Sequence, residues 1–251
     1  MTALTDIRAA LDPAVLFAEQ VGTPDQWQRD VLRSTAPRVL LNCCRQSGKS
    51  EVAATLGIHA AMFTPRSLVV LLSPSLRQSR ELFAKALAVY RAVGAAVPAE
   101  VENRLELELS NGSRLVALPG KEQTIRGFSG AALILVDEAS RVPDELYRAI
   151  RPMVAVSGGR IVALSTPWGK RGWWWQAWES GGDTWQRVQI TAEQCPRISP
   201  EFLEEERQEL GPLWYQSEYE CRFVDTSDAV FRSEEIDRAL TFDVTPLFGG
   251  G

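Results

Sequence analysis

One stretch of this sequence decides the fold, and it reads Leu40-Leu41-Asn42-Cys43-Cys44-Arg45-Gln46-Ser47-Gly48-Lys49-Ser50. The apolar run from Val39 to Leu41 predicts a buried strand, and the alanine-rich segment from Glu51 to Met62 predicts a helix. Between the two, Gly48 allows the backbone to approach an anion so closely that successive N–H groups point at it. The positive end of the helix dipole favours the same anion. The stretch therefore predicts a phosphate-binding loop.

The side chains of this loop suit a nucleoside triphosphate. Lys49 can reach the β- and γ-phosphates, and the Ser50 hydroxyl can coordinate Mg²⁺. We expect the backbone of Gln46, Ser47 and Gly48 to complete the cradle for the phosphates. Because Gly-Lys-Ser is a short motif, the alternative is a glycine turn with an exposed lysine. The flanking strand and helix favour the phosphate-binding loop.

The composition is that of an ordinary globular protein. Of the 251 residues, 45% are apolar and 24% are charged, so the chain can bury a sizeable core. No apolar run is long enough to span a bilayer and no signal peptide is apparent, so we expect a cytoplasmic protein without membrane contact. A net charge of −5 argues against a surface covered in basic residues but leaves a local basic groove open. Four cysteines without Cys-x-x-Cys spacing and a single histidine argue against structural zinc.

A second chemical signature follows another buried strand. Residues Ala131 to Val136 are apolar, and Asp137-Glu138 come directly after them. Asp137 at the strand tip can hold Mg²⁺ opposite Ser50, while Glu138 can act as the general base for an attacking water. An acidic pair after a strand can also simply cap a helix. Its position about 90 residues after Gly-Lys-Ser favours magnesium-dependent ATP hydrolysis.

Further strands complete the prediction of an α/β fold. Arg160 to Ser165 predicts a third buried strand, and Thr166 after it places a hydroxyl where the presence of a γ-phosphate can be sensed. Asn111-Gly112 predicts a hairpin between strands over Val101–Leu109 and Arg114–Leu118. The alternation of strands and helices predicts a mostly parallel sheet covered on both faces. Ligands of such sheets bind at the carboxyl ends of the strands.

The role of Gln28 has two interpretations. Thr23 before Pro24 predicts the start of a helix, and Gln28 lies about one turn later. Its amide offers a donor and an acceptor, which suit the edge of adenine. Alternatively, the segment is a surface helix in which Trp27 is half buried.

Basic and aromatic residues also leave alternatives open. A helix expected over residues 76–93 carries Arg77, Arg80, Lys85 and Arg91, which form either a solvated face, the interpretation we favour, or a contact to a phosphate backbone. Six of the eight tryptophans lie between positions 168 and 185. We expect most of them to pack a helix onto the sheet, the alternatives being a protein partner or stacking on DNA bases. Residues 199–223 predict two short helices divided by Gly211-Pro212.

Four motifs in this order resemble the ATPase domain of the large terminase subunit, which powers DNA packaging into the heads of tailed bacteriophages. They are Pro24-Asp25-Gln26-Trp27-Gln28, Arg45-Gln46-Ser47-Gly48-Lys49-Ser50, Leu135-Val136-Asp137-Glu138 and Ser165-Thr166-Pro167-Trp168-Gly169. The segment from Phe202 to Phe223 is also similar, so the resemblance covers nearly the whole chain. Phosphate loops of that family typically lack the leading glycine, which agrees with Cys43 at that position.

The resemblance implies a P-loop NTPase of the ASCE type, an α/β fold whose mostly parallel central sheet is flanked by helices, with a small C-terminal helical lid. It implies an ATPase core over residues 1–195, a helical lid or linker subdomain over 196–230 and, over 231–251, a linker towards a nuclease domain. Full-length terminases carry the nuclease carboxylates beyond such a linker. We therefore expect no nuclease activity from this chain.

The resemblance also implies a role for each matching residue in binding ATP and Mg²⁺. Gln28 matches the position that reads adenine. Lys49 and Ser50 match the phosphate and metal ligands, Asp137 matches the magnesium aspartate, and Glu138 matches the catalytic base. The reaction implied is hydrolysis of ATP to ADP and phosphate.

Three further positions match parts of the motor. Thr166 lies in the motif that couples hydrolysis to movement. Arg126, in Ile-Arg-Gly ahead of the acidic strand, falls where the family places an arginine finger, and Arg45 is a second candidate for that role.

The partners implied are double-stranded DNA, the portal protein and the small terminase subunit, in the host cytoplasm. A homo-oligomeric ring is implied for the assembled motor and a monomer for the isolated chain.

Two other functions compete with that of a packaging motor. A helicase would need further ordered motifs and a second motor domain, and 251 residues leave no room for one. A non-enzymatic nucleotide-binding scaffold would not need Lys49, Asp137 and Glu138 together.

We predict that Arg126 acts on the nucleotide of a neighbouring subunit. An arginine finger commonly balances the charge that develops on the γ-phosphoryl group, with a rate effect of roughly 10³–10⁵. The rate per subunit should then rise steeply with protein concentration. A mixture of Arg126→Ala and Glu138→Gln should recover activity in phosphate release, because some interfaces join an intact arginine to an intact glutamate. A mixture as inactive as either variant alone, with the parent active at that concentration, would exclude the trans finger.

Overall fold

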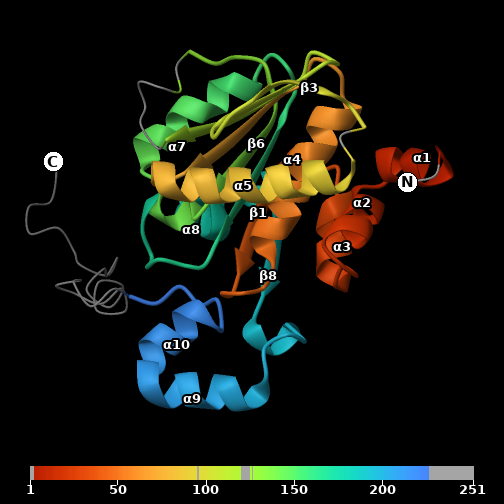
Figure 1. Ribbon diagram of the computed structural model, residues 1–251. Helices are drawn as coiled ribbons and strands as arrows, with labels where there is room; N and C mark the ends of the chain where they lie inside the picture. Colours follow the sequence, from red (N-terminus) through yellow and green to blue (C-terminus); the bar gives the residue numbers. More distant parts are fainter. Residues whose placement is uncertain (1–2, 95, 120–124, 126, 226–251) are drawn as a thin grey trace, which may run out of the picture.

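The computed structural model describes residues 3–94, 96–119, 125 and 127–225, and in these residues an eight-stranded sheet forms the centre of the molecule (Figure 1). Its strands lie in the order β3-β4-β5-β2-β6-β7-β1-β8. In chain order the strands are β1 (Arg38–Cys43), β2 (Leu68–Ser73), β3 (Ala99–Glu102), β4 (Glu106–Leu109), β5 (Arg114–Pro119), β6 (Ala131–Asp137), β7 (Arg160–Ser165) and β8 (Gln186–Ile190).

The pairing of the strands confirms the predicted ASCE type of P-loop fold. Strands β8, β1, β7, β6, β2 and β5 are parallel to one another, and β4 and β3 extend the sheet antiparallel beyond β5. Strand β7 lies between β1, which leads into the phosphate loop, and β6, which ends in Asp137. This inserted strand defines the ASCE arrangement and separates the loop from the acidic pair.

Helices cover both faces of the sheet. In the described residues the helices are α1 (Ala3–Leu11), α2 (Pro13–Gln20), α3 (Gln26–Arg33), α4 (Lys49–Phe63), α5 (Leu76–Ala92), α7 (Asp144–Ile150), α8 (Gly172–Ser180), α9 (Pro200–Leu210) and α10 (Pro212–Glu218). Side chains of α2 to α5 share one buried cluster with Val69 and Leu71 of β2. Val70 and Leu72 belong to a second cluster, with α7 and α8. Successive residues of β2 alternate between the two clusters because side chains of a strand point to opposite faces of the sheet in turn.

The tryptophans pack mainly into the second cluster, as expected. Trp173, Trp174 and Trp185 are buried there. The Trp173 ring stacks on Tyr147 with 4.0 Å between centroids, and its indole N–H donates to the Val142 carbonyl at 3.0 Å. These contacts attach α7 and α8 to the sheet, so this part of the aromatic run serves packing.

The helices α9 and α10 form a pair that lies beyond the edge of the sheet where β1 ends (Figure 1). We call this pair the C-terminal helical pair. Its return to the core is fixed by two bonds: the Asn42 side chain donates to the Cys221 carbonyl at 2.9 Å, and the Ala192 N–H donates to the Tyr219 carbonyl at 2.8 Å. The pair is therefore anchored directly to the strand that carries the phosphate loop.

Two local predictions were wrong. The helix expected from Thr23-Pro24 begins at Gln26, because the Gln28 side chain accepts a bond from the Asp25 N–H at 2.9 Å and so caps the helix two residues later. The single strand expected over Val101–Leu109 is divided into β3 and β4. The Asn103 side chain accepts bonds from the N–H groups of two following residues and closes a turn there.

Some predictions fall outside the described residues. Arg126 and the linker expected over 231–251 belong to this group, together with the last residues of the lid expected over 196–230. Within the described part of the chain, no helix has the length and apolarity needed to cross a membrane.

Candidate functional site

The phosphate loop has the conformation that an anion cradle requires. Gln46 and Gly48 have left-handed backbones, with φ of 56° and 86°, and α4 begins directly afterwards at Lys49. A glycine tolerates such a φ without strain. A Cβ atom at Gly48 would also lie 2.6 Å from Gln28 Nε2, so a side chain here would require the Gln28 amide to move.

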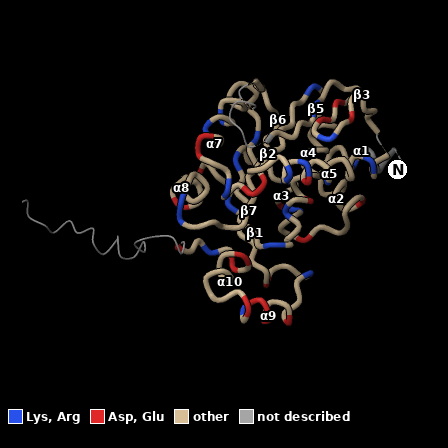
Figure 2. The backbone as a smooth tube through the Cα atoms, turned by 60° about the vertical axis from the view of Figure 1, so that its left-hand side comes forward, with Lys and Arg blue, Asp and Glu red and all other residues tan. Residues whose placement is uncertain are grey.

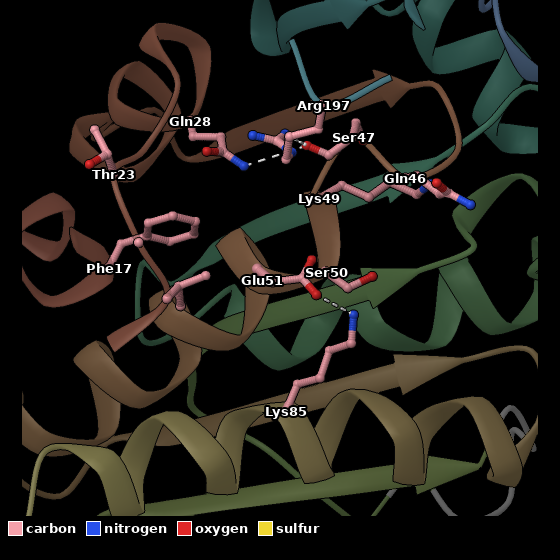
Figure 3. A pocket seen from close by; sticks show the side chains of 13 residues that line it. Phe17, Thr23, Gln28, Gln46, Ser47, Lys49, Ser50, Glu51, Lys85 and Arg197 are labelled. Atoms are coloured by element: carbon pink, nitrogen blue, oxygen red, sulfur yellow. Dashed lines mark hydrogen bonds and ion pairs between the residues drawn. The ribbon is translucent and has the colours of Figure 1, made fainter. Parts of the chain in front are cut away.

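A cavity of about 700 Å³ opens beside this loop. Figure 3 shows its side chains converging from α3, the loop, α4, α5 and the segment before α9. The lining residues are Phe17, Val21, Gly22, Thr23, Gln28, Gln46, Ser47, Gly48, Lys49, Ser50, Glu51, Lys85 and Arg197. Six of the predicted site residues thus share one cavity, of a volume that suits a nucleotide.

Both ends of the Gln28 amide are engaged by the protein. The side chain is 2% exposed, its oxygen accepts from the Asp25 N–H, and its nitrogen lies 3.5 Å from the Ser47 carbonyl. Gln28 therefore connects the start of α3 to the phosphate loop. The residue lies in the wall of the cavity.

The two basic residues of the loop are held differently. Lys49 is 8% exposed, and its Nζ lies 3.5 Å from the Cys44 carbonyl, across the loop. The Arg45 guanidinium lies 2.9 Å from the carboxylate of Glu218, a buried residue of α10. Arg45 is thus paired with the C-terminal helical pair of its own chain.

The acidic pair and Thr166 end strands next to the loop. Asp137 is level with Leu164 on β7, and Leu164 is level with Leu41 on β1. Because parallel strands end at one edge, Glu138 and Thr166 follow at the same edge as the loop. Glu138 has a left-handed backbone with φ of 49°, which is uncommon for a residue with a side chain and typical of functional sites.

The environment of Asp137 makes its charge costly. Burial, and after it the neighbouring Glu138 carboxylate, raise the pKa of Asp137 to about 6 against the opposing effect of Lys49. A divalent cation would favour the ionised form. Among the described residues, no group of three or more His, Cys, Asp or Glu side chains could hold a metal. Asp137 and Ser50 supply the hard oxygen ligands that Mg²⁺ prefers, and Mg²⁺ usually takes its other ligands from phosphates and water. The site therefore fits Mg²⁺.

The structure adds two cavity residues that the sequence did not indicate as site residues. Lys85 of α5 pairs with Glu51 at 2.6 Å (Figure 3). Arg197, before α9, pairs with Asp25 at 2.8 Å and donates to the Ser47 carbonyl at 2.7 Å. Neither lies in a recognisable motif, and no local signal distinguishes them from surface residues.

Three of the four basic residues of α5 are paired with carboxylates. Arg77 pairs with Glu81 at 3.1 Å, and Arg91 pairs with Glu102. Figure 2 shows basic and acidic residues interspersed along the described chain. These pairs support the solvated face that we favoured for this helix.

Comparisons with known proteins agree with this geometry. A family model described as terminase large subunit, T4likevirus-type, N-terminal, matches residues 40–238. The large terminase subunit of Thermus virus P23-45 is 27% identical over 258 aligned residues, which cover 88% of this chain and 53% of that protein. This chain therefore spans about half the length of that curated relative.

Solved structures share the fold. The large terminase ATPase domain of Thermus phage P74-26 is 23% identical and superposes with a TM-score of 0.74, covering 85% of this chain and 99% of that one. The large terminase of the thermophilic bacteriophage D6E in complex with ADP is 13% identical, with a TM-score of 0.66 over 80% of this chain and 54% of that one.

We predict that Asp137→Asn stabilises the metal-free protein at neutral pH. The native carboxyl, with a pKa of about 6 instead of 3.8, holds its proton more tightly than the unfolded one. Stability is therefore lost as pH rises from about 4 to 6, by about 3 kcal/mol for a shift of this size. Urea unfolding in EDTA should show the gain of Asp137→Asn at pH 7.5 and little difference near pH 4.

The exposed Asp183 provides the control, because Asp183→Asn removes a carboxylate that is not buried. It should leave the free energy of unfolding nearly unchanged at both pH values. A gain for Asp137→Asn that is equal at both pH values would show that the charge is not its cause.

Proposed function

The chain belongs to the large terminase subunit family, and from this premise we propose that it hydrolyses ATP to drive the movement of double-stranded DNA into a procapsid. The observation that carries the proposal is the meeting of a phosphate loop, a magnesium-type carboxylate and an adjoining glutamate at one edge of the sheet. An ADP complex is known for the similar D6E terminase, which supports a nucleotide in the equivalent cavity.

In this proposal the cavity holds the nucleotide along the line from Gln28 to Lys49. Gln28 and the start of α3 face the base, and the loop from Gln46 to Gly48 surrounds the phosphates with N–H groups. Lys49 supplies a compact positive charge at the β- and γ-phosphates. Its burial strengthens the attraction, because the interior screens charge less than water does.

Hydrolysis is assigned to the edge formed by β6 and β7. Ser50 and Asp137 would hold Mg²⁺, which supplies charge neutralisation between the β- and γ-phosphate oxygens when bound. Glu138 accepts a hydrogen bond from the attacking water and orients it towards the γ-phosphorus. Arg126 or Arg45 is proposed as the arginine finger, and Arg45 would have to leave Glu218 to act in this way.

Coupling to movement is assigned to the C-terminal helical pair, which we propose is the lid. The Ser217 hydroxyl of α10 donates to the Pro167 carbonyl at 3.1 Å, directly after Thr166. Glu218, the next residue, pairs with Arg45 of the phosphate loop. One turn of α10 therefore touches both loops that face the γ-phosphate, so a change there can move the lid.

The partners are proposed from family membership. They are double-stranded DNA, the portal protein, the small terminase subunit and further copies of this chain in a ring, in the host cytoplasm. Arg77, Lys85 and Arg91 of α5 are each paired with a carboxylate, so the surface that contacts DNA is not assigned to this helix.

We predict that Glu138→Gln binds ATP·Mg²⁺ as the parent does but loses turnover. The amide keeps the shape of the side chain and cannot accept the proton, and loss of a general base typically costs 10²–10⁴-fold in rate. Phosphate release at saturating ATP measures turnover, and titration with a fluorescent ATP analogue measures binding. Hydrolysis within a few-fold of the parent would refute the assignment of the base.

Lys49→Ala is the complementary variant. It removes the charge at the β- and γ-phosphates and should weaken triphosphate binding itself. If the parent protein neither bound ATP nor released phosphate, with or without duplex DNA, the proposed function as a whole would be contradicted.

A further inference from the structure

Arg197 lies where three separate segments of the cavity meet. Its Nη1 is 2.8 Å from the Asp25 carboxylate at the start of α3, and its Nη2 donates to the Ser47 carbonyl at 2.7 Å. The residue itself belongs to the segment that leads into α9. Figure 3 shows its guanidinium beside Ser47 and Gln28. One side chain thus joins the base end of the cavity, the phosphate loop and the C-terminal helical pair.

The bond to the Ser47 carbonyl bears on the phosphate cradle through the peptide plane. The Ser47–Gly48 peptide is trans, so its carbonyl oxygen and its N–H point in opposite directions. A donor that holds the oxygen therefore fixes the direction of the Gly48 N–H. If the plane turned over, an oxygen would replace the N–H at the phosphate and repel it.

This plane needs an external donor to hold it. Gly48 has no Cβ and a φ of 86°, so the peptide next to it turns more freely than it would beside another residue. Gln28 Nε2 lies at 3.5 Å from the Ser47 carbonyl, a distance at which a hydrogen bond is weak. The guanidinium bond at 2.7 Å is short and charge-assisted, which places it among the stronger hydrogen bonds of proteins.

We infer that Arg197 is a positioning residue of the nucleotide site, which clamps the Ser47–Gly48 peptide so that the Gly48 N–H faces the phosphates. The inference rests on the proposed function, because it takes the ligand to be a nucleoside di- or triphosphate. Asp25 holds the guanidinium in place, and the position of Arg197 ahead of α9 makes the clamp dependent on where the C-terminal helical pair lies.

The clamp predicts a loss of affinity that is independent of the base. Arg197→Ala should raise the Kd for ATP·Mg²⁺ and for GTP·Mg²⁺ by the same factor, about tenfold or more, as expected when a charge-assisted bond is removed. KM should rise with it while kcat at saturation stays near the parent value. Arg197→Lys should recover part of the affinity, because an ammonium group can donate to the carbonyl but lacks the fork that also reaches Asp25.

Two further variants separate the clamp from a general effect on folding. Asp25→Asn keeps a good helix cap and removes the charge partner, so it should raise Kd less than Arg197→Ala does. Combined with Arg197→Ala it should add little, because both act through one guanidinium. Arg104→Ala removes an exposed arginine between β3 and β4 that does not line this cavity, and should leave Kd and KM unchanged.

The experiment is a titration of each variant with fluorescent analogues of ATP and GTP, together with phosphate-release kinetics and melting temperatures. Equal loss for both nucleotides with an unchanged melting temperature supports the clamp. A change in the ratio of ATP to GTP affinity would assign Arg197 to the base and overturn the inference. If Arg197→Ala kept the Kd values of the parent, the clamp would be overturned and the proposed function would stand. If the parent protein bound no nucleotide, the clamp and the proposed function would both be overturned.

Discussion

The insertion of β7 between β1 and β6 is the constraint on which the site depends. Neighbouring strands lie about 4.8 Å apart, so the end of β1 and the end of β6 are separated by about 9.6 Å. That distance leaves room for a phosphoryl group, a metal ion and a water molecule between the loop and the acidic pair. Direct pairing of the two strands would halve it. Pairing of β6 and β7, with Asp137 level with Leu164, brings Thr166 to the middle of this space.

Electrostatics complements this geometry. Asp137 is buried beside a second carboxylate, and Lys49 is buried with its Nζ 3.5 Å from the Cys44 carbonyl. Burying charges in this way costs stability unless partners are supplied. Phosphates beside Lys49 and a cation beside Asp137 would satisfy both. The sheet thus keeps the charges of Asp137 and Lys49 apart, and ATP·Mg²⁺, the ligand of the proposed function, would supply a partner of opposite charge to each of them.

The sequence allowed the fold and the centre of the site to be predicted, because their signals are local. A strand, a loop and a helix within 25 residues define the phosphate loop, and the acidic pair directly follows its strand. Features that depend on distant partners could not be predicted. Arg197 reaches a carbonyl 150 positions away, and nothing in Pro-Arg-Ile marks it. The start of α3 was missed because the Gln28 side chain, not Pro24, determines where the helix is capped.

The C-terminal helical pair is connected to the site at three points, and these lie at its two ends. Arg197 precedes α9 and bonds to the Ser47 carbonyl, while Ser217 and Glu218 end α10 and contact Pro167 and Arg45. Two helices held at both ends by the same loop cannot shift without disturbing at least one of these bonds. Two of these bonds are made to the phosphate loop, at Ser47 and Arg45, and the third is made to Pro167, which follows Thr166. Under the proposed function, a change of the nucleotide at these loops would act on both ends of the pair together, which makes the pair, rather than the sheet, the element suited to convert the state of the nucleotide into motion.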